Sequence, residues 1–311
     1  MTLSKPTRRR KNTLKDKIFI FSIIIVQIIG FFVFYVYCNF KSFVMAFQLK
    51  DFHSAEQTTY WTFQNFVNMW NEFFVQDNGA LMEAFKNTMI FFVLSNVFIL
   101  WGFCTSYFIY KKVWGYKMFR ILLFIPAVLS SVVWSNIFIN VVGIEGPVAK
   151  LVQVFGGLEE VPELLTNSDY ALKTVIGYSV WFAIGTDFVL LTGSFARIPQ
   201  SLIEVGKLEG IKWGNELIRV VTPLVWPTLS TLLILNLTTL FLSSGNILLL
   251  TNGEYGTMTL SHFLFTRVYG IPETSNSFNY ASAIGLVLTV LTLPLVFLAR
   301  YLANKVEEVT Y

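Results

Sequence analysis

Charged residues are scarce in this chain of 311 residues, because only 14% are Asp, Glu, Lys or Arg, against roughly 25% in soluble proteins. Hydrophobic residues make up 54% of the chain, and its mean hydropathy is +0.59. So few charges could not cover a water-facing surface, and the 31 Phe, 13 Tyr and 8 Trp residues exclude a disordered or fibrous chain. The composition therefore predicts a protein that lies in a lipid bilayer.

Cysteine and histidine are also rare, with two residues of each type. Cys38 and Cys104 both fall at or within apolar runs, which excludes the disulfide framework of a small secreted protein. His53 and His262 are too few and too far apart to form a zinc site. We expect neither metal binding nor redox chemistry.

Catalytic motifs are missing as well. The sequence contains no phosphate-binding loop, no carboxylate pair within an apolar run, no His-Glu-x-x-His and no nucleophile elbow, so it predicts neither an enzyme nor a bound cofactor. The net charge is +4, but Lys and Arg are divided among short segments between apolar runs rather than gathered on one face. Nucleic-acid binding is therefore not expected.

Six apolar runs are long enough to cross a bilayer, which takes about 20 residues of helix. The first is too long for the hydrophobic region of a signal peptide and has no cleavage site after it, so we expect it to be uncleaved. Pro126 and Pro294 lie within two runs and predict kinks rather than breaks. The sequence thus predicts an all-α integral membrane protein with six transmembrane helices: Ile18–Tyr37, Thr88–Tyr110, Met118–Val142, Thr174–Ser194, Leu224–Leu250 and Tyr280–Ala303.

The basic residues predict the orientation of these helices. Of the 23 Lys and Arg residues, 17 lie in the segments 1–17, 110–120, 196–219 and 300–311, whereas twelve acids lie in the segments between them. Basic loops stay in the cytoplasm, so both termini are predicted to be cytoplasmic.

The resulting division is a basic tail (1–17), a first transmembrane helix (18–38), an external loop (39–85), a transmembrane core (86–305) with a cytoplasmic loop at 196–222, and a C-terminus (306–311).

Two of the outer segments carry helical patterns. Aromatic residues recur at roughly helical spacing within 39–85, and Pro147–Phe155 is predicted as a short helix that Gly156 and Gly157 end. Aromatic anchoring at the lipid headgroups explains this pattern, and a docking surface is the alternative.

The cytoplasmic loop between the fourth and fifth runs predicts a short helix that begins after Pro199 and stops at Gly210, where we expect a left-handed turn. A second short helix then leads to Pro223. The apolar side of the first helix needs a cover, either the lipid surface or the groove of a partner protein. That side consists of Leu202, Ile203, Val205 and Leu208.

This loop resembles the Glu-Ala-Ala…Asp-Gly coupling loop by which the permease subunits of binding-protein-dependent ABC importers dock onto their ATPase. The matching features are Ile198-Pro199, Glu204, Glu209-Gly210, Pro223 and Pro227. Three further segments are similar to maltose-type and oligosaccharide-type permeases, and the resemblance covers about residues 18–305. These segments are Phe119–Pro126, Leu250–Gly253 and Tyr280–Gly285.

The loop departs from the family pattern at a few positions. Val205 and Gly206 replace the two alanines, Glu209 replaces Asp, and Ile211 replaces a small residue. Gly206 should destabilise the helix by up to ~1 kcal/mol relative to alanine. The candidate coupling residues are Glu204, Gly206, Glu209, Gly210 and Pro223.

The resemblance implies a membrane-spanning permease subunit of an ATP-driven importer in a bacterial cell membrane, with a sugar or oligosaccharide as solute. It implies four kinds of partner: a second homologous permease, a dimer of ATP-binding subunits that hydrolyses the ATP, an extracellular solute-binding protein and the lipid bilayer. A secondary transporter or channel without an ATPase is the alternative. Such a protein would show inverted repeats and several intramembrane charges, and neither is evident.

Asp187 is the only ionisable side chain within the six runs away from their ends. Holding an acid at that depth costs on the order of 3 kcal/mol unless water or a partner reaches it. It is therefore a candidate for the translocation pathway or the contact with the second permease, unless its carboxylate simply reaches the inner headgroups.

A polar stripe on the fifth run is a second candidate for the pathway or the interface. Its spacings of three, four and three place the side chains within about 80° of one helix face. The stripe consists of Asn236, Thr239, Ser243 and Asn246.

Overall fold

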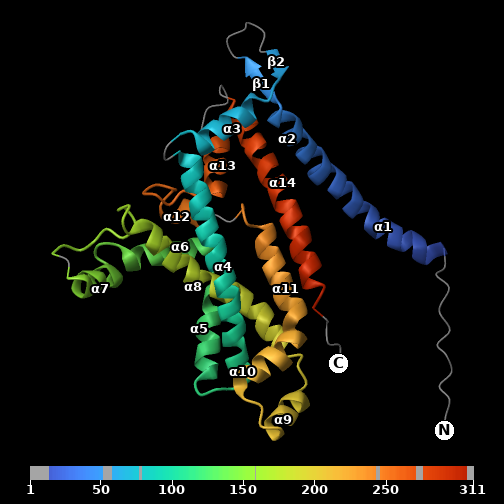
Figure 1. Cartoon of the computed structure of the whole chain (residues 1–311), viewed down its shortest axis with the longest axis vertical. Helices are drawn as coiled ribbons and strands as arrows, with labels where there is room; N and C mark the ends of the chain where they lie inside the picture. The colour runs from blue at the N-terminus through green and yellow to red at the C-terminus, as the bar shows by residue number, and fades with distance from the viewer. Residues whose placement is uncertain are drawn as a thin grey trace.

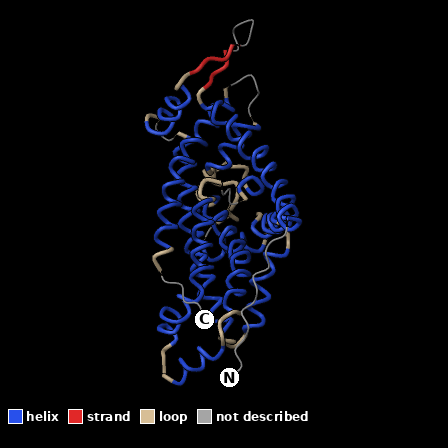
Figure 2. Tube along the Cα trace, turned by 90° about the vertical axis from the view of Figure 1, so that its right-hand side faces the viewer, coloured by secondary structure: helices blue, strands red, loops and turns tan. Residues whose placement is uncertain are grey.

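The computed structural model describes residues 14–51, 58–76, 79–157, 159–242, 246–270 and 276–306. The described chain is an elongated helical bundle with a small β-hairpin at one end (Figure 1). Helices α4, α11 and α14 run lengthwise, with α11 packed against both α4 and α14, and α8 crosses beside them (Figures 1 and 2). The α-helices are Leu14–Gly30 (α1), Cys38–Ala46 (α2), Gln64–Phe74 (α3), Ala80–Tyr110 (α4), Tyr116–Val128 (α5), Ser131–Val142 (α6), Pro147–Gly156 (α7), Ala171–Phe195 (α8), Gln200–Leu208 (α9), Trp213–Glu216 (α10), Thr222–Thr238 (α11), Ile247–Leu250 (α12), Leu260–Tyr269 (α13) and Ser277–Ala303 (α14).

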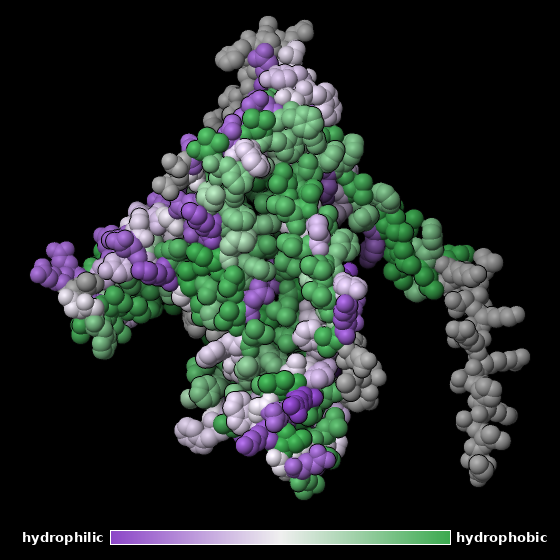
Figure 3. Space-filling model, in the orientation of Figure 1, coloured by the Kyte–Doolittle hydropathy of each residue, from purple (hydrophilic) through white to green (hydrophobic). Residues whose placement is uncertain are grey.

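The described residues contain four continuous helices that are long and apolar enough to cross a membrane, or five if a bent helix pair counts as one span. The continuous ones are Ile18–Ala46, Ala80–Tyr110, Trp213–Thr238 and Ser277–Ala303. Apolar surface covers the trunk of the bundle and α1, whereas polar residues gather near the hairpin, on the α7 side and at the α9 end (Figure 3). Such a surface is compatible with lipid, because lipid tails are as apolar as the side chains that face them.

The first predicted span is a helix that points away from the bundle (Figure 1). A π-helical stretch, η1 (Phe31–Tyr37), joins α1 to α2, so the apolar helix runs on past the predicted end at Tyr37 as far as Ala46. None of its most apolar stretch is buried, and only the α2 end packs against α14. The expected loop at 39–85 therefore begins later than predicted.

The third predicted span, Met118–Val142, is wrong as a single kinked helix. It is divided into α5 and α6, which meet at an angle of 110°. The break lies three residues after Pro126, at Leu129, whose ψ of 153° is extended, and the Ser130 hydroxyl then accepts the N–H of Val133 at 3.5 Å to cap α6. Pro126 and the following serine cap together end one helix and start another. By contrast, α14 continues through Pro294.

The fifth predicted span, Leu224–Leu250, has the wrong boundaries at both ends. The helix begins at Trp213, passes through the π-helical turn η2 (Leu217–Val221) and ends at Thr238, after which residues 239–242 form turns. Asn246, with φ +61°, is left-handed and precedes the short helix α12. Loop segments therefore lie within the helical bundle, as Figure 2 shows in tan.

The segment at the hairpin end is held by asparagine side chains. Strands β1 (Gln48–Asp51) and β2 (Thr58–Trp61) pair antiparallel, with Gln48 opposite Trp61. The side chain of Asn276 bonds both backbone groups of Lys50, accepting at 2.8 Å and donating at 3.0 Å. These bonds fix the start of α14 to β1.

The predicted short helix at Pro147 is confirmed as α7, and Gly157 ends it in a left-handed turn at φ +64°.

The largest buried cluster lies where α4, α8, α9 and α11 meet. It packs the lower half of α4 against the end of α8, the start of α9 and the first turns of the Trp213–Thr238 helix. Its members are Ile99, Phe103, Tyr107, Leu191, Phe195, Ile198, Ile203, Leu217, Val221, Val225, Leu229 and Leu232. This packing positions the predicted coupling loop.

Candidate functional site

The short helix predicted after Pro199 is present as α9, and it ends as the sequence indicates. Gly210 has φ +69°, and the N–H of Ile211 donates to the carbonyl of Gly206 at 3.0 Å. This is the geometry of a Schellman-type C-cap, in which glycine is favoured because the left-handed conformation penalises a Cβ. No atom lies within 4 Å of the position that a Cβ on Gly210 would take, so only the backbone conformation restricts this residue.

The apolar side of α9 is divided between core and surface. Ile203 is buried in the largest cluster, whereas Leu202 and Val205 are exposed and Leu208 is 88% exposed. Glu204 and Glu209 are exposed too. We call Leu202, Glu204, Val205, Leu208 and Glu209 the exposed face of α9.

The departure at Gly206 has a small steric consequence. A Cβ on this buried glycine would lie 3.8 Å from Cδ1 of Ile211, which is an ordinary contact. Alanine would therefore fit, and glycine at this position weakens α9 without being required by packing.

Pro223 lies in the first turn of α11, directly after the π-helical turn. Proline has no N–H and its ring crowds the carbonyl four residues earlier, so the wider turn at Leu217–Val221 accommodates it within a continuous helix. The carbonyl of Leu217 accepts the backbone N–H of Thr222 and also its hydroxyl, the latter at 2.7 Å.

Sequence reasoning missed an ion pair next to α9. Nζ of Lys111 lies 2.8 Å from both carboxylate oxygens of Glu216, and the Glu216 side chain is only 3% exposed. The two residues are 105 positions apart, and no sequence spacing signals such a pair.

Asp187 is half-buried on α8, which packs against α4 and α5. Close by, a Cβ on Gly185 would lie only 3.0 Å from the backbone nitrogen of Ala127 and 3.1 Å from Cβ of Pro126. The two helices therefore approach closely one half-turn before Asp187, and alanine at Gly185 would push them apart.

The predicted polar stripe does not lie on one helix, because α11 ends before Thr239. Asn236 instead forms hydrogen bonds to the hydroxyl of Ser95 on α4, at 2.7 and 3.0 Å. Asn246 donates at 3.5 Å to the hydroxyl of Tyr178, which lies 3.1 Å from the hydroxyl of Ser135. Both asparagines thus contact polar groups within the bundle, whereas Thr239 is exposed and Ser243 lies outside the described residues.

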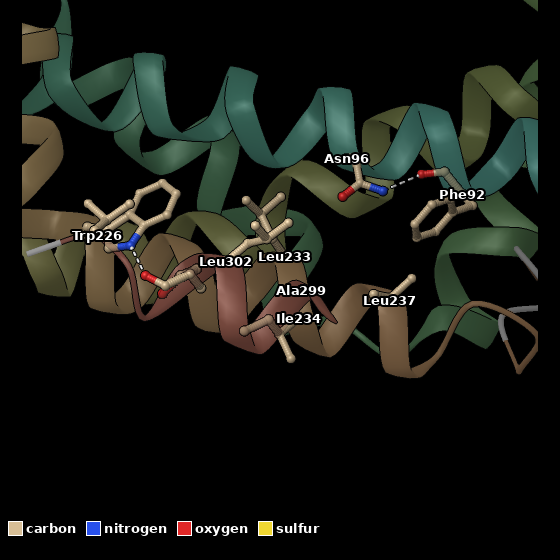
Figure 4. Close-up of a pocket in the computed structure, with 11 residues that line it drawn as sticks. Phe92, Asn96, Trp226, Leu233, Ile234, Leu237, Ala299 and Leu302 are labelled. Carbon is tan, nitrogen blue, oxygen red and sulfur yellow. Dashed lines mark hydrogen bonds between the residues drawn. The ribbon is translucent and has the colours of Figure 1, made fainter. Parts of the chain in front are cut away.

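A groove of 390 Å³ lies between α4, α11 and α14 (Figure 4). Its lining is mostly apolar, and its polar groups are already bonded: Asn96 donates to the Phe92 carbonyl at 2.8 Å, and the Trp226 indole N–H donates to the Ala303 carbonyl at 3.0 Å. A hydroxyl-rich solute would find few partners here, so this groove is not the candidate route.

Comparison with known protein families decides between an importer subunit and an unrelated transporter. Residues 98–308, more than half of the chain, match the family described as "Binding-protein-dependent transport system inner membrane component". The chain belongs to this family. The match includes α8, α9 and the whole Trp213–Thr238 helix, so the candidate coupling loop lies inside it.

Curated relatives of this inner membrane component include sugar transport permeases. The chain is 25% identical over 254 residues to the lactose transport system permease protein LacF of Rhizobium radiobacter, which covers 78% of this chain and 80% of that one. It is 26% identical over 228 residues to the multiple sugar-binding transport system permease protein MsmF of Streptococcus mutans, covering 73% and 77%.

Solved structures share the fold of this inner membrane component. A chain of a bacterial alginate ABC transporter, solved in complex with an alginate pentasaccharide-bound periplasmic protein, matches with a TM-score of 0.74 and 20% identity. The match covers 98% of this chain and 100% of that chain. The bundle therefore has the fold of an ABC importer permease.

Proposed function

We propose that this inner membrane component is the permease subunit of an ATP-driven, binding-protein-dependent importer for a carbohydrate. The observation that carries the proposal is α9 with its left-handed turn at Gly210, located between two long helices within the matched family region. The lactose, multiple-sugar and alginate transporters among its relatives favour a sugar or oligosaccharide as the solute.

The proposed architecture has six transmembrane segments. Five are the four long apolar helices and the bent pair α5–α6, and the sixth is α8, whose 25 residues exceed the length that a bilayer requires. The concentration of Lys and Arg supports cytoplasmic termini and a cytoplasmic α9, with the hairpin end outside.

Coupling is proposed to take place on the exposed face of α9. An ATP-binding subunit would cover Leu208 and Val205, which otherwise leave apolar surface in water, while Glu204 and Glu209 orient the contact. Because α9 connects α8 to the Trp213–Thr238 helix, its displacement acts on two transmembrane segments. This chain contributes no cofactor; ATP is bound and hydrolysed by the partner.

Asp187, Asn236, Thr239, Ser243 and Asn246 remain candidates for the pathway or for contact with a second, homologous permease. Asn236 bonds to Ser95 and Asn246 bonds to Tyr178, so both amides also join segments of this chain to one another. The solute would arrive from an extracellular solute-binding protein at the hairpin end.

Purification of the tagged chain from its own membranes is expected to recover an ATP-hydrolysing subunit. An importer cannot work without this partner, whereas a secondary transporter purifies alone. The measurement is ATP hydrolysis in the eluted complex, with and without added solute-binding protein. Transport that continues in vesicles without ATP would contradict the proposal.

Single cysteines should reveal the orientation. In a background where Cys38 and Cys104 are replaced by serine, cysteines at Thr59 and Glu160 are expected to react with a membrane-impermeant thiol reagent in intact cells. A cysteine at Lys117 should react only after lysis; all three positions are exposed. Labelling of Lys117 alone in intact cells would invert the proposed topology.

A further inference from the structure

We propose that Lys111 and Glu216 are positioning residues for coupling, whose ion pair holds the segment that follows α9 against the C-terminal end of α4. Movement of α9 is then passed to α4 instead of being absorbed by the loop. The inference rests on the proposed docking of α9 onto an ATP-binding subunit.

The ion pair is a fixed contact rather than a surface pair. Both carboxylate oxygens of Glu216 lie 2.8 Å from Nζ of Lys111, and the two side chains are 3% and 20% exposed. A carboxylate buried to this extent is strongly unfavourable without its partner, whereas exposed ion pairs contribute little. Separating the two residues is therefore costly, and they move together.

The helix ends favour this placement of the two charges. Lys111 caps the C-terminus of α4, where the N–H groups of Lys112 and Val113 donate back to the carbonyls of Ile109 and Phe108 at 3.0 and 3.3 Å. Glu216 lies in the first turn of the helix that begins at Trp213. A cation at a helix C-terminus and an anion at a helix N-terminus are both stabilised by the helix dipoles.

Two tyrosines bring the same turn of α4 into contact with both sides of α9. The hydroxyl of Tyr110 donates to the carbonyl of Ile198 at 3.2 Å, just before α9. The hydroxyl of Tyr107 donates to the carbonyl of Trp213 at 3.3 Å, just after it. The last turn of α4 thus holds the chain where it enters and where it leaves the coupling helix.

The contact between α4 and α9 itself is looser. A cleft of 180 Å³ lies between the end of α4 and the first turns of α9, lined by Tyr110, Lys111, Lys112, Gln200, Ile203 and Glu204. Because this space is open, the anchored ends of the loop, and above all the buried ion pair, carry the connection to α4.

The test is the amount of solute transported per ATP hydrolysed by the full complex in proteoliposomes. Lys111→Met is expected to lower this ratio about fivefold, the lower end of usual coupling effects between two sites, while the complex still binds its ATP-binding subunits. Lys111→Arg keeps the charge and should retain the ratio. Lys117→Met, which removes an exposed lysine nearby, is the matched control.

A second variant separates coupling from stability. The double variant Lys111→Met with Glu216→Met removes both buried charges, which usually leaves a protein as stable or makes it more stable. It is expected to assemble and remain poorly coupled, because the anchoring contact is gone. A wild-type ratio in this double variant, or the same ratio in Lys111→Met as in Lys117→Met, would overturn the inference. If instead the wild-type chain bound no ATP-binding subunit, the proposed function itself would fail.

Discussion

Replacing Gly210 with valine is expected to reduce solute uptake about tenfold, the effect of a penalty of about 1.4 kcal/mol, without preventing insertion into the membrane. Gly210 has φ +69°, a conformation that penalises an L-residue by roughly 1–2 kcal/mol and a β-branched residue most of all. The turn would relax and redirect Ile211 and the chain after it, so the exposed face of α9 would no longer be presented at the same angle. Uptake of radiolabelled solute and co-purification of the ATP-binding subunit are the measurements.

Two companion variants isolate the backbone conformation as the cause. Gly210→Asn should retain most uptake, because asparagine tolerates the left-handed region better than other residues. Gly214→Ala changes a helical glycine nearby, where no atom lies within 4 Å of the added Cβ, and should be neutral. Full uptake and full ATPase association in Gly210→Val would contradict the assignment of α9 as the coupling helix.

Helices and their ends were predictable where local chemistry decides them. Apolar runs of about 20 residues marked the long helices, and Gly157 and Gly210 both occupy the left-handed turns expected of glycines that follow a helix. The resemblance of the chain to permeases of binding-protein-dependent importers was confirmed by the family match over residues 98–308.

The broken helices were missed because span length was given more weight than turn signals. Ser243-Ser244-Gly245-Asn246 is a typical turn sequence, yet it lies in an apolar run long enough to cross a membrane. Likewise, Ser130-Ser131 after Pro126 indicated a new helix start. Within a membrane protein such breaks are tolerated where other helices bury them, and the sequence alone does not reveal that burial.

Contacts between distant residues could not be predicted at all. Lys111 counts as one more cytoplasmic cation in the sequence, and Glu216 as one more loop acid; only the packing of α4 against the start of the Trp213–Thr238 helix brings them together. The same holds for Asn236, whose partner Ser95 is 141 positions away.

Replacing Asp187 with leucine is expected to abolish most solute uptake while the complex assembles normally. Removing an acid from a membrane-spanning helix favours insertion by on the order of 3 kcal/mol, so loss of folding would not explain a loss of transport. Asp187 is half-buried on α8, next to the close approach of Gly185 to α5, in a region where a polar group is costly unless it has a function. The measurements are uptake and solute-stimulated ATP hydrolysis in the reconstituted complex.

Asp187→Asn distinguishes charge from polarity, because it keeps the size of the side chain and one acceptor oxygen but replaces the charged second oxygen with a neutral NH2 donor. Partial uptake in this variant, with almost none in Asp187→Leu, would mean that Asp187 acts as a hydrogen-bonding group beside the pathway or towards the second permease. Equal loss in both variants would mean that the negative charge itself is needed. Unchanged uptake and unchanged stimulation in Asp187→Leu would instead show that the carboxylate lies near the inner end of α8, about 10 Å of helix away at 1.5 Å rise per residue, without any part in transport.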